Sequence, residues 1–107
     1  MTGRTVAPGL DPGLVRLLAE PLRLRIIQML AVEELCTCHM VEETGAKQPT
    51  VSHHLRQLKE AGVVDAEPVG AYTYYRLRPD VLLHMAHALE DLGQQASTAP
   101  RRRLPCD

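Results

Sequence analysis

The chain has 107 residues, enough for one domain with a modest core, and a formal charge of −1 at pH 7. No apolar run approaches the roughly 18 residues of a membrane helix, and residues 1–12 lack the basic and apolar regions of a secretory signal. Its three cysteines, an odd number, do not make a disulfide framework and indicate reduced thiols in the cytoplasm.

Apolar residues near the N-terminus recur with the period of a helix. They are Leu14, Val15, Leu17, Leu18, Leu22, Ile26, Ile27 and Leu30. Pro21 interrupts the pattern and suits the first turn of a new helix. We therefore predict one helix over residues 13–19 and a second over residues 21–32.

Two further helices are predicted in the middle of the chain. Thr37 is a candidate N-cap for a short helix over residues 38–44, which Gly45 would end. A short turn leads to a longer helix over residues 48–61, followed by a glycine at the usual C-terminal position. Two helices joined by a turn of this length are typical of a helix-turn-helix.

The pattern then changes from helical to extended. Residues 63–77 are rich in β-formers on both sides of Gly70, which predicts a hairpin that turns at this glycine. Pro79 begins a last helix that we expect to end near Gly93. A hairpin directly after a helix-turn-helix is the winged form, so the fold class is mainly α with a β-hairpin wing.

The composition divides the chain into three regions. Residues 1–12 are expected to form a flexible N-terminal tail, and residues 13–93 the winged helix-turn-helix domain. Residues 94–107 are expected to form a flexible C-terminal tail that carries Cys106. A lone domain of this size buries little apolar surface, so we expect a homodimer, which would bury more of it.

The helix over residues 48–61 has an apolar side and a polar side. Pro49, Ser52, His53 and Arg56 lie opposite Val51, Leu55 and Leu58, and Thr50, His54 and Gln57 lie on the flank. The groups in this half of the helix suit base edges and phosphates, and the candidate DNA contacts are Gln48, Thr50, Ser52, His53 and Arg56. Because the chain is not basic overall, DNA binding needs local positive charge, to which Arg76 in the hairpin would contribute. The alternative is an ordinary solvated helix face.

Several segments together resemble the ArsR/SmtB family of repressors. These are residues 48–55, residues 58–64, Pro21-Leu22-Arg23 and Tyr74-Tyr75-Arg76-Leu77, within a resemblance that covers residues 14–92. The resemblance implies a dimer whose first and last helices form the interface, a recognition helix in the major groove and a wing near the minor groove. Effector binding would release the DNA. Lys47 stands where relatives often carry a capping Ser, and is a candidate phosphate contact.

The segment from Leu35 to Met40 is the most reactive part of the sequence. Cys36 and Cys38 supply two soft thiol ligands, which favour thiophilic ions over magnesium or calcium. The alternative is a pair of small buried hydrophobic residues. Residues two apart in a regular helix lie about 200° apart, so one ion could hold both thiolates only by bending or unwinding that turn.

This pair matches the Cys-x-Cys of arsenite-responsive ArsR members, in which three thiolates bind As(III) or Sb(III). Many of those members carry a third Cys where this chain has Val41. The remaining thiol, Cys106, is a candidate third ligand from the tail, because a tethered group can reach a high effective concentration. It is equally an incidental tail residue. His39 is a fallback donor, better suited to Zn(II) or Cd(II).

The resemblance also allows other triggers. The zinc site of some relatives uses an Asp-x-His pair in the last helix, which Asp80-Val81-Leu82 lacks, and His84 and His87 are better explained as a solvated or interface pair. We therefore predict a repressor that releases operator DNA on binding As(III) or Sb(III). The alternatives are a divalent soft metal (Cd(II), Pb(II) or Zn(II)) or thiol oxidation. The sequence contains no Gly-rich phosphate loop and no nucleophile elbow, so we do not expect an enzyme.

Overall fold

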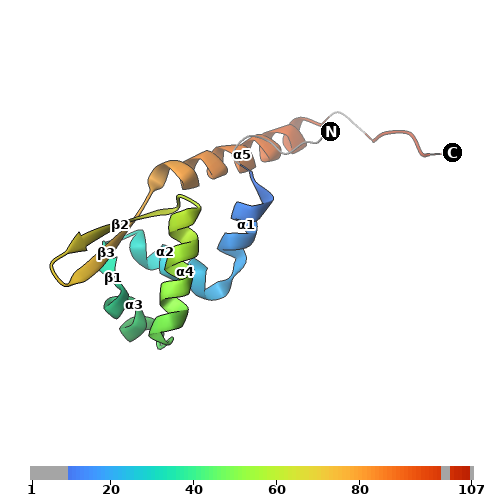
Figure 1. The fold of residues 1–107 in the computed structure, drawn as a ribbon. Helices are drawn as coiled ribbons and strands as arrows, with labels where there is room; N and C mark the ends of the chain where they lie inside the picture. The colour runs from blue at the N-terminus through green and yellow to red at the C-terminus, as the bar shows by residue number, and fades with distance from the viewer. Residues whose placement is uncertain (1–9, 100–101, 107) are drawn as a thin grey trace.

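The computed structural model describes residues 10–99 and 102–106 of the chain. Five α-helices and a small antiparallel sheet make up this part (Figure 1). In chain order they are α1 Pro12–Ala19, α2 Pro21–Leu30, β1 Leu35–Cys36, α3 Thr37–Thr44, α4 Gln48–Glu60, β2 Val64–Val69, β3 Tyr72–Leu77 and α5 Pro79–Thr98.

Each of the first two helices begins with a capping carboxylate followed by a proline. The Asp11 carboxylate accepts the backbone N–H of Leu14 at 3.0 Å, and that of Glu20 accepts the backbone N–H of Arg23 at 2.7 Å. The break predicted at Pro21 is confirmed, because Glu20 is both the last cap of α1 and the first cap of α2.

A glycine in the left-handed backbone conformation follows each helix of the helix-turn-helix. Gly45 follows α3 with φ of 74°, and Gly62 follows α4 with φ of 77°. Side chains with a Cβ rarely adopt this conformation, so glycine is needed to reverse the chain there. The predicted N-cap of α3 is wrong by one residue. Cys36 holds that position with an extended backbone, and Thr37 is already helical.

The wing belongs to a three-stranded sheet with the order β1-β3-β2. Strands β2 and β3 form the predicted hairpin, which turns at Gly70 with φ of 61°. The two-residue strand β1 was not predicted, because two residues are too short to show an alternating pattern. It pairs with β3 through Leu35 opposite Tyr75 and Cys36 opposite Tyr74.

The core lies between α2, α3, α4 and the first residues of β2. Its fully buried members include Ile26, Met40, Val51, Leu55, Leu58 and Val63. These residues hold the helix-turn-helix on α2 and orient the polar side of α4 outward. At about 1.5–3 kcal/mol for each large apolar side chain buried, this small cluster is the main favourable term in folding.

Helix α5 crosses near the start of α1 and extends past the rest of the domain (Figure 1). Only Met85 and Ala88 of this helix are buried. The helix continues to Thr98, beyond the end predicted near Gly93, so the predicted boundary at residue 93 falls inside it. One glycine costs a helix only about 1 kcal/mol, and the Gln and Ala residues that follow are favourable. None of the helices described is long and apolar enough to cross a membrane.

Candidate effector and DNA-binding sites

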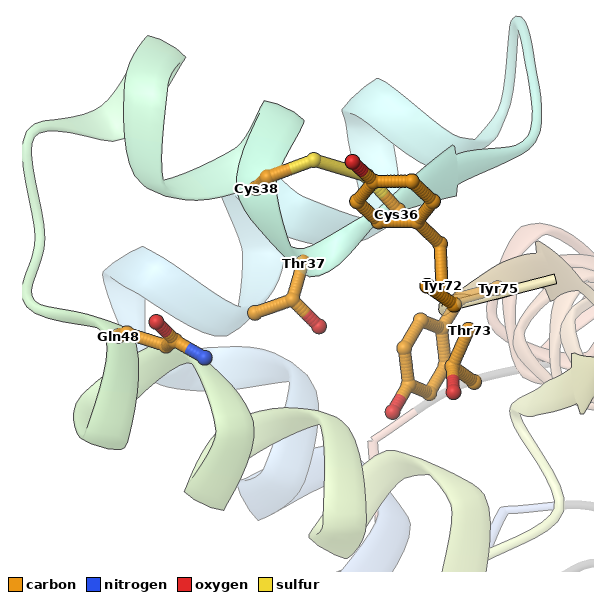
Figure 2. A pocket seen from close by; sticks show the side chains of 8 residues that line it. Cys36, Thr37, Cys38, Gln48, Tyr72, Thr73 and Tyr75 are labelled. Atoms are coloured by element: carbon orange, nitrogen blue, oxygen red, sulfur yellow. A yellow bond between two sulfur atoms is a disulfide. The ribbon is translucent and has the colours of Figure 1, made fainter. Parts of the chain in front are cut away.

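The two cysteines of the Cys-x-Cys segment lie on different elements. Cys36 is the buried last residue of β1, and Cys38 is exposed in the first turn of α3. Because the backbone of Cys36 is extended, both sulfur atoms reach the same side of the turn, where they are joined as a disulfide (Figure 2). The expectation that one ion must unwind a helix to hold both thiolates is therefore wrong, since only Cys38 is helical.

A histidine completes the group. His39 Nδ1 accepts the backbone N–H of Cys36 at 3.1 Å and lies 3.3 Å from Cys36 Sγ. The ligand atoms of Cys36, Cys38 and His39 all lie within 4.8 Å of one another, and they form the one such group of three in the described residues. Cys106 is exposed and does not belong to this group. Once the disulfide is reduced, two thiolates with one imidazole would suit soft ions.

A recess of about 390 Å³ lies beside the cysteine pair (Figure 2). Cys36, Thr37 and Cys38 form one wall, and Gln48 contributes from the start of α4. The wing supplies the remaining lining residues, Ala71, Tyr72, Thr73 and Tyr75. The recess therefore borders the cysteine segment, the start of α4 and the wing at once.

The polar side of α4 is open to solvent as the helical wheel predicts. Lys47, Gln48, Thr50, His53 and Arg56 are exposed and Ser52 is half-buried. Lys47 is the N-cap residue, but its side chain makes no capping hydrogen bond. The first backbone N–H groups of α4 thus have no side-chain cap, which leaves them available to a phosphate.

The arginines at the base of the wing lie among carboxylates. Arg76 lies opposite Asp65 in the hairpin, with its Nη2 3.7 Å from the Asp65 carboxylate. Arg78 approaches Asp65 at 4.0 Å and Asp80 at 3.1 Å, and its hydrogen bond lowers the pKa of Asp80. These exposed pairs reduce the positive charge that Arg76 offers to DNA. The positive charge available to DNA is therefore greater at α4, where Lys47 and Arg56 are exposed, than at the base of the wing.

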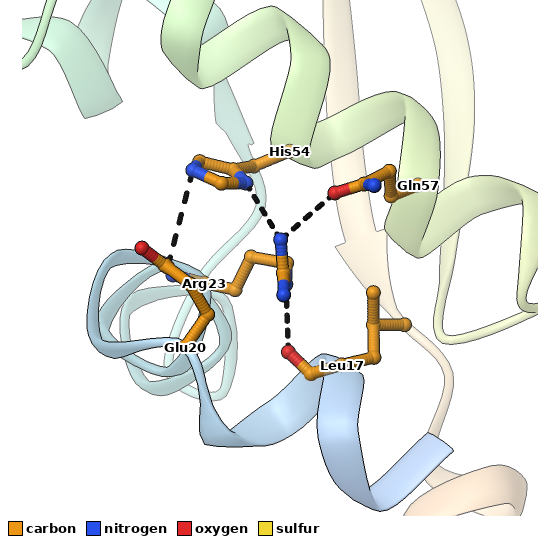
Figure 3. Close-up of polar contacts among 5 residues, drawn as sticks. All are labelled: Leu17, Glu20, Arg23, His54 and Gln57. Atoms are coloured by element: carbon orange, nitrogen blue, oxygen red, sulfur yellow. Dashed lines mark hydrogen bonds and ion pairs between the residues drawn. The ribbon is translucent and has the colours of Figure 1, made fainter. Parts of the chain in front are cut away.

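Arg23 joins three helices in a polar network that the sequence did not reveal (Figure 3). Its Nε donates to the Leu17 carbonyl of α1 at 2.7 Å. Its Nη1 donates to Gln57 Oε1 at 2.8 Å and lies 3.0 Å from His54 Nδ1, both on α4. One guanidinium therefore fixes the recognition helix against α1 and α2.

His54 is buried, with 8% of its surface exposed, and does not flank the DNA-reading side as the helical wheel suggested. It follows Val51 by three residues and precedes Leu58 by four, a spacing that places it at the edge of the apolar side. Its Nε2 lies 3.9 Å from Glu20, whose pKa is lowered first by the backbone hydrogen bond from Arg23. An imidazole among these partners has a structural role.

A helix-turn-helix with a hairpin wing defines the class: the chain is a winged helix-turn-helix protein. Residues 20–66 match the arsR family of bacterial regulatory proteins. An HTH-type transcriptional regulator of Methanocaldococcus jannaschii is 35% identical over 74 residues, which cover 68% of this chain and 83% of that protein. The chain belongs to the ArsR family of transcriptional regulators, a family of DNA-binding proteins and not of enzymes.

Other similar proteins have more specific names. An arsenic resistance transcriptional regulator of Pseudomonas putida is 39% identical, over 65% of this chain and 56% of that protein. The cadmium resistance regulator CadC of Listeria innocua is 36% identical, over 68% and 62%. The chain thus spans less than two thirds of these two relatives. The crystal structure of a possible transcriptional regulator for arsenical resistance superimposes with a TM-score of 0.65 at 30% identity, over 80% and 95% of the two chains.

Proposed function

We propose that the chain is a transcriptional repressor that releases its operator when As(III) or Sb(III) binds the thiolates of Cys36 and Cys38. The observation that carries this proposal is the meeting of both sulfur atoms beside a recess that α4 and the wing also line. Reduction of the pair gives the ion-binding form. The names of the arsenic-related relatives support the choice of ion. Cys106, from the same or the partner subunit, is the proposed third ligand.

The DNA partner is a duplex operator in the cytoplasm. We assign its contacts to the N-terminal half of α4, with Arg76 adding a contact from the wing. The proposed set is Lys47, Gln48, Thr50, Ser52, His53, Arg56 and Arg76. Hydroxyl, amide and imidazole groups would read base edges, and the cations would bind phosphates.

The second partner is another copy of this chain. An apolar groove of about 620 Å³ lies between α1 and α5. Its lining residues are Leu10, Pro12, Val15, Arg16, Leu18, Met85 and Leu89. Val15 and Leu89 are 44% and 53% exposed, and a two-fold interface would remove this apolar surface from water.

Thiol protection tests the ligand assignment. The reduced protein is alkylated with and without As(III), and each cysteine is followed by mass spectrometry. We expect As(III) to protect Cys36 and Cys38, and protection of Cys106 would assign the third ligand. Unchanged alkylation of both Cys36 and Cys38 would contradict the proposal.

The DNA-reading side predicts the effect of an α4 substitution. Arg56→Ala should weaken operator binding by about 1–3 kcal/mol, because it removes one charged contact, while As(III) affinity stays unchanged. Fluorescence anisotropy at several salt concentrations measures both the loss and the salt slope. Lys59→Ala, in the last turn of the same exposed face, is the control and should cost less. An intact operator affinity in Arg56→Ala at physiological salt would place the reading face elsewhere.

A divalent soft metal is the second candidate, and His39 favours it because its Nδ1 lies in the cysteine group. Imidazole is a common ligand of Zn(II) and Cd(II), whereas As(III) prefers thiolates. If Cd(II) is the inducer, His39→Ala should weaken its binding by at least about tenfold, as even outer ligands contribute that much. Titration of the reduced protein with Cd(II) and As(III) in parallel measures this. Equal losses for both ions would indicate that His39 only shapes the turn.

Thiol oxidation is the third candidate, favoured by the disulfide between Cys36 and Cys38. Under this alternative the two thiols lose two electrons and two protons to an oxidant such as a peroxide, which is reduced to water and an alcohol or a second water. Release of DNA by hydrogen peroxide in chelator-treated buffer, reversed by a dithiol reductant, would select it over either ion.

A further inference from the structure

The Cys-x-Cys segment crosses the junction between two structural units. Cys36 ends β1, and its backbone pairs with Tyr74 in the strand that forms one side of the wing. Cys38 belongs to α3, the first helix of the helix-turn-helix. An ion held by both sulfur atoms therefore binds the wing sheet through one ligand and the helix-turn-helix through the other.

The wing also faces the cysteine group through its side chains. Tyr72, Thr73 and Tyr75 line the recess beside the two sulfur atoms (Figure 2). His39, the third member of the group, also contacts the wing: its ring centroid lies 6.1 Å from that of Tyr74, with 59° between the two ring planes. This tilted arrangement is within the range of favourable ring contacts. All three members of the group thus have a neighbour on β3 or in the turn before it.

His39 connects the metal-binding atoms to Tyr74. Its Nδ1 accepts the Cys36 N–H and lies 3.3 Å from Cys36 Sγ, while its ring packs on Tyr74. An ion that binds Cys36, or takes Nδ1 as a ligand, competes with these contacts. The imidazole must then adjust, and Tyr74 is the wing residue that the adjustment reaches first.

We propose that effector binding acts on DNA affinity through the wing, and that Tyr74 is the positioning residue that transmits it. This inference rests on the proposed function. Allosteric coupling requires an element whose arrangement affects both ligands. The wing meets this condition, because β3 pairs on one side with β1, which carries Cys36, and on the other side with β2 in the hairpin that carries the proposed DNA contact Arg76. In this proposal Tyr74 acts through His39 and is neither an ion ligand nor one of the proposed operator contacts.

The coupling factor tests this role, defined as operator affinity without effector divided by operator affinity with saturating As(III). Tyr74→Ala should keep As(III) affinity and effector-free operator affinity near the parent values, while its coupling factor falls about tenfold, within the usual allosteric range. Tyr74→Phe keeps the ring and should restore the parent factor. Glu67→Gln, on β2 opposite Tyr74 and exposed, is the control and should leave it unchanged.

A reporter in the wing covers the case in which Tyr74→Ala does not fold. The chain has no Trp, so Val69→Trp, on the exposed end of β2 outside the recess lining, gives a single Trp signal when excited at a wavelength that the three Tyr residues do not absorb. As(III) should shift this emission in DNA-free protein. An unshifted emission, or a parent coupling factor in a folded Tyr74→Ala, would overturn the role of the wing. If As(III) leaves the parent protein on its operator, the proposed function itself fails.

Discussion

Cys36→Ser is expected to bind the operator as the parent does and to remain bound when As(III) is added. A serine hydroxyl is close in shape to a thiol but is a hard, weak donor for a soft ion. Cys36 is 3% exposed, and the smaller oxygen should fit its site at a cost of about 1 kcal/mol, the usual scale for a single substitution. Anisotropy of labelled operator DNA, titrated with As(III), measures both properties.

Two further variants make this prediction specific. Cys38→Ser should show the same loss, although Cys38 is exposed and contributes little to packing. Cys106→Ser should still respond to As(III), with a weaker response if Cys106 is the third ligand. If Cys36→Ser loses operator binding before any ion is added, the cysteine is structural and the ligand assignment is wrong.

Arg23→Met is expected to lower the free energy of unfolding by about 3 kcal/mol and to weaken operator binding. Methionine fills much of the volume but leaves the Leu17 carbonyl, Gln57 Oε1 and His54 Nδ1 without their donor. Each buried polar group left unpaired costs about 1–3 kcal/mol, and partial burial places these at the lower end. The operator affinity falls because α4 loses its polar link to α1 and α2.

Urea denaturation measures the stability change, and operator titration at low temperature measures the affinity of the folded variant. Arg25→Met is the matched control, since Arg25 lies on the same helix and, within residues 10–99 and 102–106, donates a single exposed hydrogen bond, to the Glu43 carbonyl. We expect it to cost less than about 1 kcal/mol. Equal losses in the two variants would show that the network does not hold α4.

Local signals in the sequence were sufficient for most of the fold. The 3.6-residue spacing of apolar residues predicted the helices, and Pro21, Gly45 and Gly70 marked breaks and turns that the structure confirms. Strand β1 was missed because a two-residue strand exists only through its pairing with β3. The continuation of α5 past Gly93 was missed because a single glycine is a weak stop signal.

The candidate site shows the same division between local and long-range information. The spacing of Cys36 and Cys38 identified a thiol pair, but their positions on a strand and a helix depend on β1, which the sequence did not show. The Arg23 network links residues more than thirty positions apart, so no local pattern could predict it. The spacing of His54 from Val51 and Leu58 places it at the edge of the apolar side, and the network gives the buried ring its polar partner.

The most direct test of the account is one titration of As(III) into the reduced protein bound to fluorescent operator DNA. We expect the anisotropy to fall to the value of free DNA at low equivalents of As(III), with no fall for a Cys36→Ser, Cys38→Ser double variant. An anisotropy that stays at the bound value for the parent protein would contradict the account.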